Sequence, residues 1–195
     1  MALVVGLGNP GAPFARTRHN VGWRVVELLV RRWRARPEPW LPRYRAWSAE
    51  LGSRAVQLLT PLTFMNLSGA ALAAWRERHG LESGDLLVVA DDVYLPFGSL
   101  RLRRSGSSGG HRGLESIEAE LGGREYARLR IGVGAAQHSA ALREHVLKEF
   151  EQEDEAAVDQ VLELAAAAVE CWVREGATAA MNRFNRRVPK EDSTP

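Results

Sequence analysis

The sequence predicts a single α/β domain in which helices flank a mixed, largely parallel and twisted β-sheet. Short apolar runs typical of buried strands alternate along the chain with longer segments of helical apolar spacing. Glycines and prolines separate these segments, and no segment is repeated. Strands that alternate with helices are the pattern of α/β folds. The length of 195 residues fits one such domain.

The first half of the chain begins with a buried strand and an amphipathic helix. An apolar run from Val4 ends in glycines and a turn, as expected of a strand that leaves the core. Apolar residues then recur on one helical face, which predicts a helix from His19 to about Arg34. The elements expected next are a loop over Arg36–Pro42, strands over Ala46–Leu51 and Ala55–Leu59, and a helix over Asn66–His79.

The second half continues the alternation and ends in a long helix. A second continuous apolar run, Leu86–Ala90, predicts another buried strand, and two aspartates close it. The elements expected after it are strands over Leu100–Arg103 and Leu129–Val133, a glycine-rich loop with a helix to about Leu121 between them, and helices over Glu153–Glu175 and Thr178–Phe184. We therefore expect one domain over residues 1–187 and a disordered tail over 188–195.

Composition indicates a cytoplasmic protein. Hydrophobic residues make up 45% of the chain, which is enough for a sizeable core. No apolar run is long enough to span a membrane, and the N-terminus lacks a signal-peptide pattern. The single cysteine, Cys171, excludes an internal disulfide, and its apolar helical neighbours predict a small buried side chain rather than a nucleophile.

Charge is strongly segregated although the net charge is only +2. Arginines dominate from Arg16 to Arg45, and the segment Pro96–Gly113 has four arginines and no acid. Residues Glu151–Glu175 are acidic, with Arg174 as their only base. A nearly neutral protein with one basic face can bind a polyanion such as RNA. The alternative for the N-terminal arginines is an ordinary solvated surface.

The glycines of the first turn match a dinucleotide-binding fingerprint, Gly6-x-Gly8-x-x-Gly11. That fingerprint needs a helix that starts at once and points free N–H groups at a pyrophosphate. Pro10 lacks an N–H and Pro13 delays the helix further, so the pattern argues against the match. A nucleotide-dependent oxidoreductase remains only as an alternative.

Polar side chains gather where the predicted strands end. Asn9 and His19 follow the first strand, Asn66 opens a helix, Asp91 closes the second apolar strand, and a glycine-rich loop carries His111. Chemistry in α/β folds is usually placed at such strand ends. A carboxylate fixes the tautomer of a histidine and stabilises its protonated form, so this set predicts a histidine that activates water for ester hydrolysis. No serine or cysteine stands in a nucleophile-elbow context, and no histidine pair has metal-ligand spacing.

Each of these residues also has a plain structural interpretation. The histidine could make a structural hydrogen bond at a helix start, the aspartate could cap a turn, and Asn66 could cap its helix. Phe64 and Met65 could belong to the core, and His111 is a better loop support than catalyst. The other histidines, which we expect to be solvated, are His79, His138 and His145.

Motifs in one order along nearly the whole chain resemble bacterial peptidyl-tRNA hydrolases. The motifs that carry the resemblance are Gly6-Leu7-Gly8-Asn9-Pro10-Gly11, Thr17-Arg18-His19-Asn20-Val21-Gly22, Thr63-Phe64-Met65-Asn66-Leu67-Ser68-Gly69, Asp91-Asp92, Leu95-Pro96 with Gly98, Gly109-Gly110-His111 with Gly113-Leu114, and Leu129-Arg130-Ile131-Gly132-Val133-Gly134. The resemblance implies a single α/β domain that hydrolyses the ester between a peptide and the 3′ end of tRNA, as a monomer, with no metal and no organic cofactor.

The resemblance also implies a role for each matching residue. His19 would be the general base on water, Asp91 would hold it, and Asn9 would help to distinguish a blocked amine from free aminoacyl-tRNA. Phe64, Met65 and Asn66 would contact the peptide end, and Arg101, Arg103 and Arg130 the tRNA phosphates. Phe14 and Arg112 stand at substrate-contacting positions with residues that differ from the family's usual ones.

Three positions depart from the family's pattern. Phe14 stands where a tyrosine is usual, Arg112 replaces the asparagine after the loop histidine, and Tyr94 replaces an aspartate of many members. None of the three belongs to the His19–Asp91 pair, so activity is expected. The alternative is a relative that binds RNA without hydrolysing it.

Overall fold

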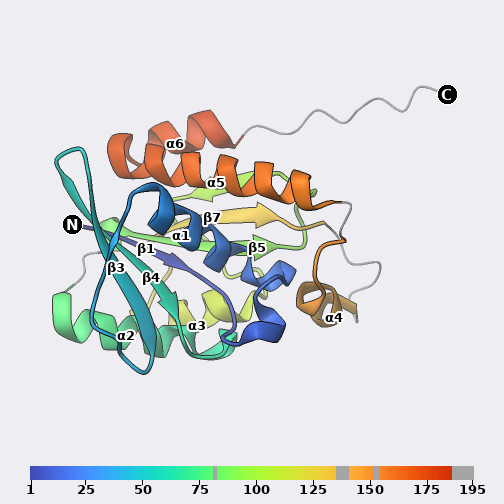
Figure 1. Ribbon diagram of the computed structural model, residues 1–195, viewed down its shortest axis with the longest axis horizontal. Helices are drawn as coiled ribbons and strands as arrows, with labels where there is room; N and C mark the ends of the chain where they lie inside the picture. Colours follow the sequence, from blue (N-terminus) through green and yellow to red (C-terminus); the bar gives the residue numbers. More distant parts are fainter. Residues whose placement is uncertain (81–82, 135–140, 152–153, 186–195) are drawn as a thin grey trace.

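A seven-stranded sheet forms the centre of the computed structural model, which describes residues 1–80, 83–134, 141–151 and 154–185 (Figure 1). Its strands are β1 (Ala2–Gly6), β2 (Arg36–Pro37), β3 (Tyr44–Leu51), β4 (Arg54–Pro61), β5 (Leu86–Asp92), β6 (Leu100–Arg103) and β7 (Ala127–Gly132). Across the sheet the order is β2-β3-β4-β1-β5-β7-β6. The central strands β4, β1, β5 and β7 are parallel, and the outer strands pair antiparallel. The predicted mixed, largely parallel sheet is confirmed.

Helices cover both faces of the sheet (Figure 1). On one face lie α1 (Val21–Arg32), α5 (Glu155–Glu175) and α6 (Ala177–Phe184), and on the other α2 (Ser68–His79) and α3 (Arg112–Leu121). The short helix α4 (Leu142–Leu147) lies beyond the ends of β5 and β7. Single turns of 3-10 helix are η1 (Ala12–Phe14), η2 (Arg18–Asn20), η3 (Met65–Leu67) and η4 (Ser83–Asp85). Within the described ranges no helix is sufficiently long and apolar to cross a bilayer.

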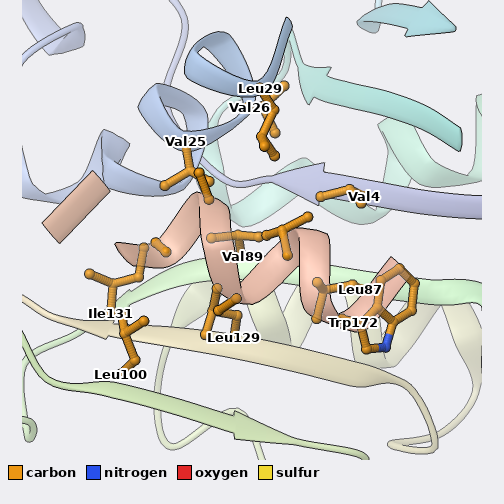
Figure 2. Close-up of a cluster of buried hydrophobic side chains, with 14 of the residues drawn as sticks. Val4, Val25, Val26, Leu29, Leu87, Val89, Leu100, Leu129, Ile131 and Trp172 are labelled. Atoms are coloured by element: carbon orange, nitrogen blue, oxygen red, sulfur yellow. The ribbon is translucent and has the colours of Figure 1, made fainter. Parts of the chain in front are cut away.

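Burial on both faces explains the continuous apolar runs of the central strands. Successive side chains of a strand point to opposite faces, so Val4 packs under α1 and α5 while Leu3 and Val5 pack under α2 and α3. Figure 2 shows the first of these clusters, in which Val25 and Leu29 of α1 face the sheet beside α5.

Glycines bring the start of α1 down onto the sheet. A Cβ atom at Gly22 would lie 2.2 Å from the carbonyl oxygen of Val89, and one at Gly6 would lie 2.3 Å from the carbonyl oxygen of Gly22. The tight approach leaves no room for a side chain and fixes the preceding turn, which carries His19, above the end of β5. Gly11 leads into η1 rather than into α1, so the long helix that a dinucleotide fingerprint needs does not follow it.

Two predicted helix starts were wrong by two residues each. The helices expected to start at His19 and Asn66 start at Val21 and Ser68, because each is preceded by a 3-10 turn. Arg36–Pro37, expected in a loop, forms the edge strand β2, and α4 was not predicted. The tail expected from residue 188 lies outside the described residues.

The N-terminal arginines face the acidic helix. Arg16 pairs with Glu155 and Arg32 with Glu163, while Arg24 lies 3.8 Å from Asp159. Charges that are segregated along the chain thus neutralise each other between the α1 region and α5. This favours the interpretation of these three arginines as part of the surface between two helices rather than as a polyanion-binding face.

Candidate active site

Two histidine side chains hydrogen-bond to the buried carboxylate of Asp91 at the end of β5. Nδ1 of His19 lies 2.8 Å from Oδ1 of Asp91, and Nε2 of His111 lies 2.9 Å from the same oxygen. Asp91 is only 2% exposed, and the two imidazole rings are 5.0 Å apart. The expected proximity of His19 and Asp91 is therefore present. His111, expected only to support its loop, also belongs to the cluster.

Hydrogen bonds fix which nitrogen of each ring carries a proton. Nδ1 of His111 accepts from the N–H groups of Gly113 and Leu114 at 3.2 and 3.3 Å and so caps α3. The proton of this ring therefore lies on Nε2, which donates to Asp91. Nδ1 of His19 donates to the same carboxylate, which leaves the lone pair of the neutral ring on Nε2. That nitrogen can accept a proton from water.

The carboxyl group of Asp91 is held in its ionised form. Burial by itself raises the pKa of this group, but the charge and the hydrogen bonds of His19 and His111 outweigh burial and hold the pKa well below its usual range. A permanent negative charge at this position can stabilise an imidazolium that forms during a reaction.

Replacing Asp91 by asparagine should make stability less dependent on pH in acid. Because folding lowers the pKa of Asp91, the stability that its ionisation contributes is complete above the unfolded value of about 3.9 and is lost as pH falls below it. We expect the difference in melting temperature between wild type and Asp91→Asn to shrink between about pH 6 and about pH 3. Thermal unfolding over this range measures it, and a constant difference would contradict the assignment.

Asn9 is held by a pair of amide hydrogen bonds. Its backbone N–H donates to Oδ1 of Asn20 and its carbonyl accepts from Nδ2 of Asn20, both at 2.9 Å. The Oδ1 of Asn9 itself accepts from the N–H of Met65 at 2.8 Å, which orients the amide so that its Nδ2 donor remains. Asn20 had no role in the sequence analysis. Its amide type and its place next to His19 were the signals that could have identified it.

Two cavities flank His19. One, of about 210 Å³, lies towards β7, and the other, of about 330 Å³, lies towards η1 and η3. The first is lined by His19, Asp91, Asp92, Val93, Tyr94, Gly109, Gly110, His111, Arg112, Arg130, Leu142, Arg143 and Val146. The second is lined by Asn9, Phe14, His19, Phe64, Met65, Asn66, Arg112, Arg143, Val146 and Leu147. The histidine can therefore act on a bond whose two ends occupy different cavities.

The second cavity gathers the residues expected at the peptide end. Phe14 and Phe64 meet edge to face with ring centroids 6.5 Å apart. Phe64 is 57% exposed, so the core interpretation is wrong for it, whereas Met65 is buried in the core and also reaches the cavity. Asn66 is exposed and does not cap α2, because the cap position is Leu67. The amide of Asn66 is thus placed to meet a ligand.

Arg130, expected to bind tRNA phosphate, is buried, and its guanidinium group is hydrogen-bonded to other groups of the protein. Its Nη1 lies 2.9 Å from Oδ2 of Asp92, and its Nη2 donates to the carbonyls of Ser107 and Ser108. A Cβ atom on Gly109 would lie 3.3 Å from both nitrogens, so the glycine-rich loop wraps the guanidinium. The geometry favours a residue that braces the loop of His111 over one that contacts phosphate directly.

Asp92, which the sequence analysis gave no role, fixes the next loop. Its Oδ1 accepts from the N–H of Tyr94 at 2.8 Å, while its other oxygen holds Arg130. The turn-capping role considered for Asp91 therefore belongs to Asp92 instead.

The exposed arginines lie on the edge strand β6. Arg101 and Arg103 point away from the core, whereas the alternating Leu100 and Leu102 are buried. Neither arginine is ion-paired within the part of the chain that the structure describes, so this edge strand can bind a phosphate backbone.

The histidine and aspartate atoms also come close enough to be tested as a metal site. The ligand atoms of His19, Asp91 and His111 lie within 4.8 Å of one another. The separations of 2.8 and 2.9 Å from a shared oxygen are hydrogen-bond lengths, and Nδ1 of His111 already serves α3. The donors present therefore fit a hydrogen-bonded cluster better than a metal site, in which both protons would have to leave.

The remaining histidines lie elsewhere. His79 is exposed and stacks on Trp75 with ring centroids 4.6 Å apart. His145, expected to be solvated, is half-buried, with Nε2 3.1 Å from the carbonyl oxygen of Gly134. It ties α4 to the end of β7. His138 lies outside the described residues.

Comparison with known proteins identifies the family of this chain. The model of the family described as peptidyl-tRNA hydrolase matches residues 3–192. The peptidyl-tRNA hydrolase of Desulforudis audaxviator is 46% identical over 189 residues, which cover 95% of this chain and 93% of that protein. That of Roseiflexus castenholzii is 45% identical and covers 98% of this chain and 90% of its own length. The crystal structure of peptidyl-tRNA hydrolase from Acinetobacter baumannii superposes with a TM-score of 0.89 at 30% identity, covering 97% of this chain and 96% of its own. The chain belongs to the peptidyl-tRNA hydrolase family.

Proposed function

We propose that this protein hydrolyses the ester that joins a peptide to the 3′ end of tRNA, with His19 as the general base. The observation that carries the proposal is the His19–Asp91 pair, because Nδ1 of His19 is bonded to Asp91 while His19 lines two cavities at once. An ester with a nucleotide on one side and a peptide on the other needs such a bipartite site.

The reaction follows from the protons already assigned. Nε2 of His19 takes a proton from a water molecule as the water oxygen attacks the ester carbonyl, and Asp91 stabilises the imidazolium that forms. The imidazolium then gives the proton to the ribose oxygen as the carbon–oxygen bond breaks. An amide donor in the second cavity, from Asn66, can stabilise the oxyanion. General-base help contributes about 10²–10⁴-fold and an oxyanion donor about 10²–10³-fold.

Asn9 is suited to select blocked substrates. Because its Oδ1 is engaged by the N–H of Met65, it offers the cavity a donor and no acceptor. A donor can bind the carbonyl of a peptide bond or an acetyl group, but it gives nothing to a charged ammonium. This supports the role proposed for Asn9 in rejecting free aminoacyl-tRNA.

The decisive test is release of N-acetyl-aminoacyl groups from tRNA, with unblocked aminoacyl-tRNA as the control. Rapid hydrolysis of the blocked ester alone would establish both activity and selectivity. Binding of tRNA without turnover would instead support the alternative of a non-catalytic RNA-binding relative.

Replacing Arg101 by alanine should weaken substrate binding and leave the chemical step alone. The side chain is exposed on β6, so its loss removes a phosphate contact without disturbing packing. We expect KM to rise by several-fold and the slope of log KM against log salt to flatten by about 1. Steady-state kinetics over a range of salt concentrations measures both, and a loss confined to kcat would contradict the role.

We further propose that the protein works in the cytoplasm as a monomer. The single cysteine, Cys171, is buried, so any association of two chains would have to be non-covalent. Sedimentation equilibrium at micromolar concentration tests the oligomeric state.

A further inference from the structure

Two arginines, Arg112 and Arg143, line both cavities beside His19. Arg112 is the first residue of α3, and Arg143 is the second residue of α4. Both residues are exposed, and neither is ion-paired with an acid among the described residues. Two helices that are separate in the sequence thus each contribute one arginine to the same two cavities.

The acids in reach of these arginines have other partners. Asp91 holds two histidines, Asp92 holds Arg130, and Glu144 pairs with Lys148 at 2.7 Å. Glu115, one turn along α3, is exposed and makes no ion pair with Arg112. Two positive charges therefore line both cavities without an acidic partner among the described residues, which favours an anionic ligand.

The substrate in the proposed function always carries one anion near the scissile bond. The ribose that bears the ester also bears a phosphodiester on its 5′ oxygen, so a phosphate lies within one sugar of the reacting carbon. An acidic peptide side chain would be present only in some substrates. Guanidinium groups bind phosphate in a bidentate manner, which makes a pair of them well matched to it.

We propose that Arg112 and Arg143 bind the 5′-phosphate of the esterified nucleotide and so position its ribose against His19. The inference rests on the proposed function, and it places a phosphate of the substrate within the site beside His19. Arg101 and Arg103 must serve other phosphates, because β6 lies two strand positions from β5, or roughly 10 Å, and their side chains point outward.

Binding of a non-hydrolysable analogue tests the inference without relying on turnover. The probe is 3′-deoxy-3′-(N-acetylphenylalanyl)aminoadenosine, in which an amide replaces the ester, prepared with a free 5′-hydroxyl or with a 5′-methylphosphate. We expect calorimetry on the wild type to show about 30-fold tighter binding of the phosphorylated form, since hydrogen bonds to charged groups are among the stronger ones. In Arg112→Ala and in Arg143→Ala the preference should fall to about fivefold, and in the double variant it should vanish.

Matched controls separate this role from others. Arg31→Ala removes an exposed arginine from the far end of α1 and should keep the full preference. A wild type that binds both forms equally, or neither, would overturn the inference, as would variants that lose affinity for both forms alike. An N-acetylglutamyl analogue with a free 5′-hydroxyl provides the competing outcome: if the two arginines are needed for its binding instead, they hold an acyl-chain carboxylate. Hydrolysis of N-acetyl-aminoacyl-tRNA is measured separately. Failure of the proposed function can therefore be distinguished from failure of the phosphate-binding inference.

Discussion

His19→Ala should lower kcat by about 10³-fold while leaving the fold and the affinity for tRNA nearly unchanged. The reason is that Nε2 of His19 is the proposed proton acceptor and His19 lines both cavities. The ring is only 13% exposed, and among the described residues its side chain hydrogen-bonds to Asp91 alone. Single-turnover hydrolysis of N-acetyl-aminoacyl-tRNA measures the chemical step, and filter binding of deacylated tRNA measures the affinity.

A matched histidine provides the control. His79→Ala removes an exposed ring that stacks on Trp75 at the end of α2, far along the chain from the strand ends that build the site. Its kcat should equal that of the wild type. If His19→Ala kept more than about a tenth of the wild-type rate, another group would have to be the base.

Arg130→Ala should both destabilise the protein and slow catalysis. Removing the guanidinium leaves the buried carboxylate of Asp92 unpaired and frees two carbonyls of the glycine-rich loop. Loss of one partner of a buried ion pair costs about 3–5 kcal/mol, which corresponds to a fall in melting temperature of about 10 °C for a chain of this size. Because the loop leads to His111, we also expect kcat to fall by about 10- to 100-fold.

Comparison with Arg101→Ala shows whether Arg130 holds the glycine-rich loop in place or contacts phosphate directly. A direct phosphate contact at Arg130 would raise KM and flatten its salt dependence, as expected for Arg101, without lowering the melting temperature. Arg130→Lys retains the charge but cannot reach three acceptors with one planar group, so it should restore little of kcat. Full rescue of kcat by lysine would show that charge alone matters at this position.

Local patterns in the sequence were sufficient to predict the sheet and most helices. Continuous apolar runs identified β1 and β5 because both faces of these strands are buried. Ends of elements were harder to place, because His19 and Asn66 sit in 3-10 turns whose residues have no periodicity of their own. The helix α4 spans only six residues, with no buried face, which leaves no periodic signal to detect.

The centre of the site could be predicted, but its supports could not. Asp91 and His19 are residue types with one obvious chemistry at strand ends, so their pairing was foreseeable. The role of Arg130 depends on burial, which the alternation of charges along β7 does not reveal, since Arg128 is buried as well. His111 looked like a loop residue because its second role needs a carboxylate 20 positions away.

The capping hydrogen bonds of His111 make the two histidines unequal as proton carriers. If Nδ1 of His111 took up a proton, the N–H groups of Gly113 and Leu114 would lose their acceptor and the first turn of α3 would be left uncapped. Taking a proton at Nδ1 would therefore cost His111 the cap of α3, whereas His19 makes no such capping bond to a helix N-terminus among the described residues. In the proposed reaction His19 therefore holds the proton taken from water until it is transferred to the departing ribose oxygen. The same ring acts first as general base and then as general acid.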